Sequence, residues 1–104
     1  MMPRRRRRRG RRGRIPTPVY IGHQPAADAF IPKPAGDKAP INLEGEELEA
    51  LRLVDLEGLS QEEAGVRMGV SRGTVWRLLQ RARRKVAQAL TEGRRINLST
   101  VEAG

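Results

Sequence analysis

The chain has 104 residues, and its Pro-rich first forty leave about sixty for one small folded domain. It contains no cysteine, which excludes disulfides, thiolate zinc sites and thiol nucleophiles, and its three aromatic residues leave an aliphatic core typical of small helical domains. The net charge is +9, and residues 1–14 alone hold nine arginines and no acid.

The charge beyond residue 14 is segregated along the chain. Asp28 to Glu63 carries ten acids against three bases, whereas Arg67 to Arg95 carries nine bases against one acid. A basic second half is typical of a protein that binds a polyanion. No apolar run reaches the length of a membrane span, and the first arginines are not followed by the apolar stretch of a signal peptide, so we expect a cytoplasmic protein with no membrane partner.

The N-terminal forty residues divide into two segments. Residues 1–14, MMPRRRRRRGRRGR, cannot bury apolar surface and repel one another, which predicts a disordered arginine arm. Residues 15–40 are predicted to form an extended strap or linker, because regular helix is disfavoured by six prolines: Pro16, Pro18, Pro25, Pro32, Pro34 and Pro40. The domain itself is expected over 41–98, followed by a tail at 99–104.

The domain is predicted to be all-α, with three helices at about 46–57, 61–68 and 72–91. In the first helix a broad apolar stripe is formed by Leu48, Leu51, Val54 and Leu56, and Gly58 ends it. The runs Ile41–Leu43 and Ile96–Leu98 leave open a short β-ribbon, although each is short for a strand.

A three-residue turn separates the second and third helices. Ser60 and Glu63 form an S-x-x-E capping box before the second helix, Gly69 ends it, and Ser71 caps the third. Two helices joined in this way, the second one basic, are typical of helix-turn-helix proteins. The positions that lock such a motif are also suitably filled, by Ala64, Gly65, Met68, Gly69, Val70, Val75 and Leu78.

If those positions face inward, the first turns of the third helix present the residues that would enter a major groove. The candidate DNA-binding residues are Ser71, Arg72, Gly73, Thr74, Trp76, Arg77, Gln80 and Arg81. Arg72 and Arg77 can each donate two hydrogen bonds to guanine, and Gln80 can do so to adenine. Ser71 and Thr74 are better suited to phosphate.

Each assignment has a structural alternative. Arg72 and Arg77 could be solvated surface residues, and Trp76 could cover the edge of the core. The basic run from Arg81 to Lys85 is equally typical of a solvated face and of phosphate contacts. For non-specific phosphate contacts the candidates are Arg84 and, in the arm, Arg4, Arg5, Arg6, Arg7, Arg8 and Arg9, although the arm could also be a tail without a role.

Catalysis, metal binding and a cofactor are not expected. His23 is the only histidine, and no carboxylate pair or serine-histidine arrangement accompanies it. The acids at the start of the first helix lack a His or Cys partner and are expected to cap that helix: Glu44, Glu46, Glu47 and Glu49.

Two stretches carry a family resemblance: Lys33-Pro34-Ala35-Gly36, and ELEALRLVDLEGLSQEEAGVRMGVSRGTVWRLLQRARRKVAQAL from Glu47 to Leu90. They resemble uncharacterised protein family 0251, also called domain of unknown function 134. The resemblance covers about 30–96 and implies a helix-turn-helix similar to the fourth region of sigma factors, in small prokaryotic proteins predicted to bind DNA. Members commonly carry N-terminal cysteines, which this chain lacks.

We therefore expect a transcriptional regulator that binds double-stranded DNA in the nucleoid and is not an enzyme. Two alternatives remain open: an RNA-binding or ribosome-associated protein, for which the arginine arm argues, and a module that docks on RNA polymerase. A homodimer would supply two DNA half-sites, with Val86, Ala89 and Leu90 as candidate contacts if the monomer leaves them exposed.

Overall fold

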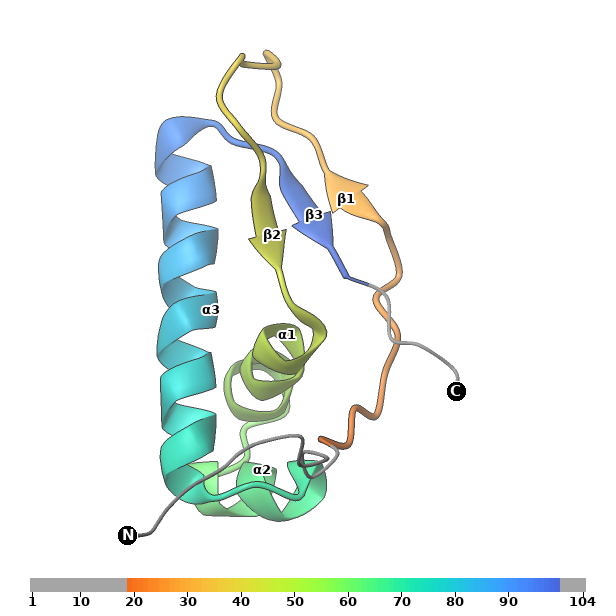
Figure 1. The fold of residues 1–104 in the computed structure, drawn as a ribbon, viewed down its shortest axis with the longest axis vertical. Helices are drawn as coiled ribbons and strands as arrows, with labels where there is room; N and C mark the ends of the chain where they lie inside the picture. The colour runs from red at the N-terminus through yellow and green to blue at the C-terminus, as the bar shows by residue number, and fades with distance from the viewer. Residues whose placement is uncertain (1–18, 100–104) are drawn as a thin grey trace, which may run out of the picture.

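The computed structural model describes residues 19–99. The elements in chain order are β1 (Ala29–Phe30), β2 (Ile41–Leu43), α1 (Gly45–Leu51), the π-helical segment η1 (Arg52–Leu56), α2 (Gln61–Met68), α3 (Arg72–Glu92) and β3 (Ile96–Leu98). Figure 1 shows α3 along one side of the molecule, with α1 and the sheet beside it and α2 at its N-terminal end. The predicted arginine arm lies outside the described residues.

The prediction of an all-α domain is wrong, because the mostly helical fold also contains a three-stranded sheet in the order β1-β3-β2. The ribbon left open by the sequence is present: β2 pairs with β3 in parallel, with Ile41 opposite Ile96 and Leu43 opposite Leu98. The strap supplies the third strand, since β1 pairs antiparallel with β3. A strand as short as β1 is stable here only because β3 supplies its hydrogen-bonding partners.

The strap is extended along the helices, as its prolines favour. At its start the Tyr20 backbone N–H donates to the Met68 carbonyl at 2.9 Å, and Val19 packs against the helical core. Further along the strap, the Asp28 carbonyl accepts from the Leu98 N–H at 2.9 Å. The strap therefore runs from the end of α2, to which it is hydrogen-bonded, to the sheet, and it lies along one side of α1 (Figure 1).

The first predicted helix is continuous but changes its geometry halfway. After α1 the backbone widens into η1, where the Glu57 N–H donates to the Arg52 carbonyl, five residues back, at 2.9 Å. A π-turn shifts the faces of a helix relative to an α-helical wheel. Leu53, three residues after the buried Ala50, continues the buried face of α1, whereas Leu56 of the predicted apolar stripe is exposed. Leu51 and Val54 of that stripe are partly buried against the core.

The second and third helices begin and end where their capping residues predicted. Ser60 Oγ accepts from the Glu63 N–H at 3.0 Å, and Glu63 Oε1 accepts from the Ser60 N–H at 2.8 Å. Gly69 ends α2 with φ +72°, a left-handed conformation that glycine adopts at little cost. The third helix extends one residue beyond its predicted end, to Glu92, before Gly93 stops it.

The core lies where α1, η1 and α2 pack against the N-terminal half of α3. It consists of buried aliphatic side chains from all four elements: Ala50, Leu53, Ala64, Met68, Val75, Leu78 and Leu79. Val70, in the turn, packs against it and is partly buried. Of the residues expected to lock α2 on α3, five are buried: Ala64, Gly65, Met68, Val75 and Leu78. Gly69, in the turn, is exposed, and the opposite side of α3 faces solvent.

Candidate nucleic-acid interface

The N-terminal end of α3 is fixed by a network of short hydrogen bonds. Ser71 Oγ accepts from the Thr74 N–H at 3.1 Å and lies 3.0 Å from Thr74 Oγ1. Arg77 Nη2 donates to Thr74 Oγ1 at 3.2 Å, which orients the guanidinium along the helix. Ser71 and Thr74 therefore cap and order the helix start, a structural role that leaves their outer lone pairs able to meet a partner.

One side of α3 carries a continuous row of exposed residues, here called the α3 stripe: Arg72, Gly73, Trp76, Arg77, Gln80, Arg81 and Arg84. Their spacing of three and four residues places them on one face of the helix. Trp76 is 52% exposed, so it is not part of the core. Thr74 is half-buried beside the stripe.

The start of the stripe is hollowed. A shallow depression there is lined by Arg72, Gly73, Trp76 and Arg77, with Gln61 of α2 completing it. The absence of a side chain at Gly73 makes the floor of the depression low. A methyl group placed there would lie no closer than 3.8 Å to a neighbouring side chain, at Arg77 Nη1, so the packing does not require glycine at this position. The depression exposes two guanidinium groups and one indole within the first two turns of the helix.

The basic residues of α3 fall into two groups. Arg83 Nη2 donates to Asp55 Oδ1 at 2.7 Å and its Nε to Asp55 Oδ2 at 3.0 Å, a bidentate pair between α3 and η1. The hydrogen bond from Arg83 lowers the pKa of Asp55, outweighing the small opposing effect of desolvation. Lys85 Nζ donates to Glu47 Oε1 at 2.7 Å and to the Asn42 carbonyl at 2.8 Å.

By contrast, the four arginines of the stripe are free of carboxylates within residues 19–99: Arg72, Arg77, Arg81 and Arg84 make no ion pair there. The basic run from Arg81 to Lys85, which the sequence could not resolve, is thus divided by the fold. Arg83 and Lys85 hold α3 against α1, η1 and β2, whereas Arg81 and Arg84 remain available to an anionic partner.

The acids at the start of α1 accept hydrogen bonds from groups of the same chain. Glu47 Oε1 accepts from the Glu44 N–H at 2.9 Å, which caps the helix as expected. Glu49 instead accepts two hydrogen bonds from Arg52, at 2.8 and 3.0 Å, and one from the Gly22 N–H at 2.8 Å. Burial tends to raise the pKa of Glu49, but these bonds and the positive charge of Arg52 outweigh it and lower the pKa.

The remaining predicted residues are placed as follows. His23 lies exposed on the strap near Glu49, and no group of three metal-ligating side chains is found in the described part of the chain. Of the candidate dimer contacts, Ala89 is buried within the monomer, Val86 is half-buried and Leu90 is exposed. Arg4 to Arg9 lie outside the described residues. No helix between residues 19 and 99 is long and apolar enough to cross a bilayer.

Sequence reasoning missed two features. The Arg83–Asp55 and Lys85–Glu47 pairs join residues 28 and 38 positions apart, and no local pattern relates them. An apolar cavity between the strap and α1 was also missed, because its walls come from segments that meet only in the folded chain.

The fold and the site define a small, mostly helical protein with a mixed three-stranded sheet and a basic, unpaired stripe on its longest helix. A family model described as a protein of unknown function, DUF134, matches residues 2–103. The chain therefore belongs to the DUF134 family, and the resemblance to uncharacterised protein family 0251 is confirmed.

Curated relatives carry the name UPF0251 protein. One from Pyrococcus furiosus is 53% identical over 85% of this chain and 82% of its own length. One from Archaeoglobus fulgidus is 49% identical over 82% of this chain and 81% of its own. One from Thermococcus kodakarensis is 67% identical over 64% of this chain, but the match spans only 55% of that relative. No solved structure matches the chain significantly.

Proposed function

We propose that the protein binds double-stranded DNA in a sequence-specific manner and regulates transcription, with α2, the turn and α3 acting as a helix-turn-helix. The observation that carries the proposal is the α3 stripe. It combines unpaired guanidinium groups with a depression at the N-terminal end of a helix whose other side is locked into the core. A recognition helix meets the major groove with this end.

The chemistry of the stripe matches the edges of base pairs. Arg72 and Arg77 reach out from the first two turns, where a guanidinium can donate two parallel hydrogen bonds to guanine, and Gln80 follows one turn later for adenine. The Ser71 hydroxyl and the helix N-terminus, with its partial positive charge, suit a phosphate. Arg81 and Arg84, further along, would contact phosphates of the groove wall.

The exposed Trp76 ring also supports a ligand-facing role, because a large aromatic side chain left half in water has not been used to build the core. Its apolar face would contact a thymine methyl group or sugar carbons. The low floor at Gly73 would let the backbone of α3 approach the DNA closely.

The arginine arm would add affinity that does not depend on sequence, because each arginine that neutralises a phosphate releases a counterion. A single domain of this size contacts few base pairs, so a homodimer would provide two half-sites. Leu90 is the exposed apolar candidate for that contact, since Ala89 is buried inside the monomer.

The proposal is tested by selecting bound sequences from a random pool of DNA duplexes with the full chain. We expect one recurring motif, which the double variant Arg72→Ala/Arg77→Ala fails to enrich. The matched control is Arg95→Ala, which removes an exposed arginine that lies beyond the far end of α3.

Failure would also be informative. If no motif is enriched while the chain binds RNA and duplex DNA equally, the helix does not read DNA sequence and the RNA-binding alternative replaces the proposal. If the chain binds neither nucleic acid but binds RNA polymerase, the docking module replaces it.

A further inference from the structure

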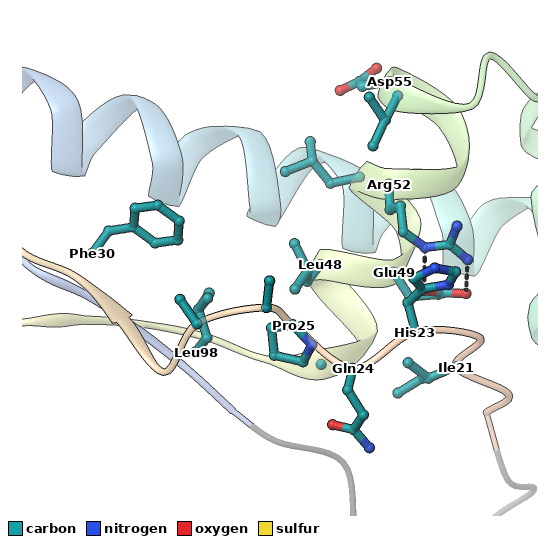
Figure 2. Close-up of a pocket in the computed structure, with 15 residues that line it drawn as sticks. Ile21, His23, Gln24, Pro25, Phe30, Leu48, Glu49, Arg52, Asp55 and Leu98 are labelled. Carbon is teal, nitrogen blue, oxygen red and sulfur yellow. Dashed lines mark hydrogen bonds and ion pairs between the residues drawn. The ribbon is translucent and has the colours of Figure 1, made fainter.

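A cavity of about 520 Å³ opens between the strap and the first helix. Figure 2 shows its layout: Pro25 and Leu98 lie across from Leu48, Phe30 stands at one end, and Glu49, Arg52 and His23 stand at the other. The walls thus come from the strap, α1, η1 and β3. The volume falls within the roughly 300–1,000 Å³ typical of pockets for organic ligands.

The lining is almost entirely apolar. Besides Pro25, Leu48 and Leu98, it includes Ile21, Ala27, Leu51 and Leu56. Phe30 is 61% exposed and Leu56 77% exposed, although both are large apolar residues on the cavity wall. These side chains keep apolar surface in contact with water, which is unfavourable unless something covers it.

The carboxylates of the wall are already engaged. Glu49 accepts from Arg52 and from the Gly22 N–H, and Asp55 accepts twice from Arg83. Arg52 also donates to Glu57 at 3.3 Å. An occupant would therefore find few charges to pair with and would have to bind by apolar contact.

This property discriminates between classes of occupant. An extended peptide brings one N–H and one C=O for each residue, and the carboxylates of this wall, already engaged, offer them few partners. An uncharged organic molecule has no such series of N–H and C=O groups that need hydrogen-bond partners. A second observation supports a binding site. The π-helical turn η1 supplies Arg52, Asp55 and Leu56 to the wall, and π-turns inside helices occur frequently at functional sites.

We infer that this cavity is a binding site for a small, uncharged and predominantly apolar organic molecule. The molecule lies between the strap and α1, against Leu48, Leu56 and Leu98, and covers the ring of Phe30. The inference concerns a site separate from the α3 stripe and does not depend on DNA binding.

The probe for the test is N-phenyl-1-naphthylamine, an uncharged aromatic dye that fluoresces in apolar surroundings. An uncharged dye is chosen because the net charge of +9 would draw an anionic one to the basic surface. With the full chain we expect saturable fluorescence at one dye for each chain. The methyl NMR signals of Leu48, Leu56 and Leu98 should shift on binding, while those of Val66 and Leu90 should not.

A matched pair of variants locates the site. Leu56→Ser and Leu90→Ser each replace a leucine that is 77% exposed, but only Leu56 lines the cavity. We expect Leu56→Ser to weaken dye binding about fivefold, because it removes apolar contact area, and Leu90→Ser to leave binding unchanged. Ala27→Leu, which fills the cavity, should weaken binding at least about tenfold.

Three results would overturn the inference. The first is dye binding that does not saturate, and the second is methyl shifts at Leu90 in place of the cavity leucines. The third is a dimer, detected by sedimentation, that Leu56→Ser dissociates and the dye displaces. That last result would make a second copy of the chain the natural occupant.

Discussion

A methyl group placed on Gly65 of α2 would lie 2.7 Å from the carbonyl oxygen of Val70 in the turn. The same turn folds back so that the Val70 N–H donates to the Gly65 carbonyl at 2.9 Å. Backbone therefore touches backbone at this position, and neither side can move like a flexible side chain. The close approach of α2 to the turn sets the angle at which α3 leaves it.

Gly65→Ala is expected to destabilise the protein by about 1–2 kcal/mol. The steric cost of overpacking, about 1–3 kcal/mol, exceeds the gain of up to about 1 kcal/mol from the better helix propensity of alanine. Urea unfolding followed by circular dichroism measures the difference. Gly73→Ala is the matched control, because its new methyl group meets nothing closer than 3.8 Å, and its stability should stay within about 0.5 kcal/mol of the native chain. Equal stability of the two variants would contradict the close contact.

Glu49→Gln is expected to lower the free energy of unfolding by about 2 kcal/mol at pH 7, because Arg52 loses its buried anionic partner. The Glu49 side chain is only 4% exposed, so solvent screens the pair little. The Gly22 N–H keeps an acceptor in the amide variant, so the loss measures mainly the charge interaction.

The same pair predicts a pH dependence. The pKa of Glu49 is lowered from 4.5, so its stabilising effect is fully present above pH 4.5 and is lost as the pH falls through the lower pKa of the folded state. The stability difference between the native chain and Glu49→Gln should therefore shrink below pH 4.5. Urea titrations of both chains at several pH values measure it, and a difference that is constant with pH would be incompatible with this account.

The Arg83–Asp55 pair is bidentate but largely exposed, with side chains 46% and 39% accessible. A double-mutant cycle of Arg83→Gln and Asp55→Asn should therefore give a coupling energy of no more than about 1 kcal/mol, falling at high salt. Since the pKa of Asp55 is lowered, the coupling should also vanish at acid pH, when the carboxyl is protonated. A coupling that is unaffected by salt would show that the pair acts by packing instead.

On the proposed function, Arg77→Ala and Arg84→Ala should affect DNA binding differently. If Arg77 reads a base, as proposed, its loss should weaken binding to the selected site by about tenfold or more and relax the preference at one position. If Arg84 contacts phosphate, as proposed, its loss should weaken binding to all duplexes alike and reduce the salt slope by about 1. Fluorescence anisotropy with matched and scrambled duplexes distinguishes the two, and identical behaviour would refute the division of roles.

The arginine arm should act through salt dependence alone. Replacing Arg4 to Arg9 with glutamine in the full chain removes up to six phosphate contacts, and the slope of log affinity against log salt should become shallower by up to about 5. The selected DNA motif should stay the same. A changed motif would mean that the arm itself reads sequence in a groove.

The sequence by itself determined the helices and their turn, because the signals for helix ends are local. Ser60, Gly69, Ser71 and Gly93 each act through backbone groups within a few residues, and they predicted α2 and α3 to within one residue. The inward side of those helices followed from the spacing of their apolar residues. The outward α3 stripe followed in turn, although its role as a DNA-binding surface is still a prediction.

Only the tertiary structure decided the rest. Strands of two or three residues carry too little pattern to reveal a partner. The paired strands lie more than 50 positions apart in the sequence, so β1 and the order of the sheet could not be predicted. Leu53 is buried and Leu56 is exposed because the packing of this helix against α2 and α3 decides which of its closely spaced leucines reach the core.

The tertiary structure also decided which basic residues of α3 form ion pairs. Arg81, Arg83, Arg84 and Lys85 form one basic run in the sequence, but the fold places carboxylates beside Arg83 and Lys85 alone. Whether an arginine stabilises its own protein or remains available to a partner depends on which acids lie within a few ångströms, because the interaction between exposed charges decays rapidly in water. That distance is set by long-range packing.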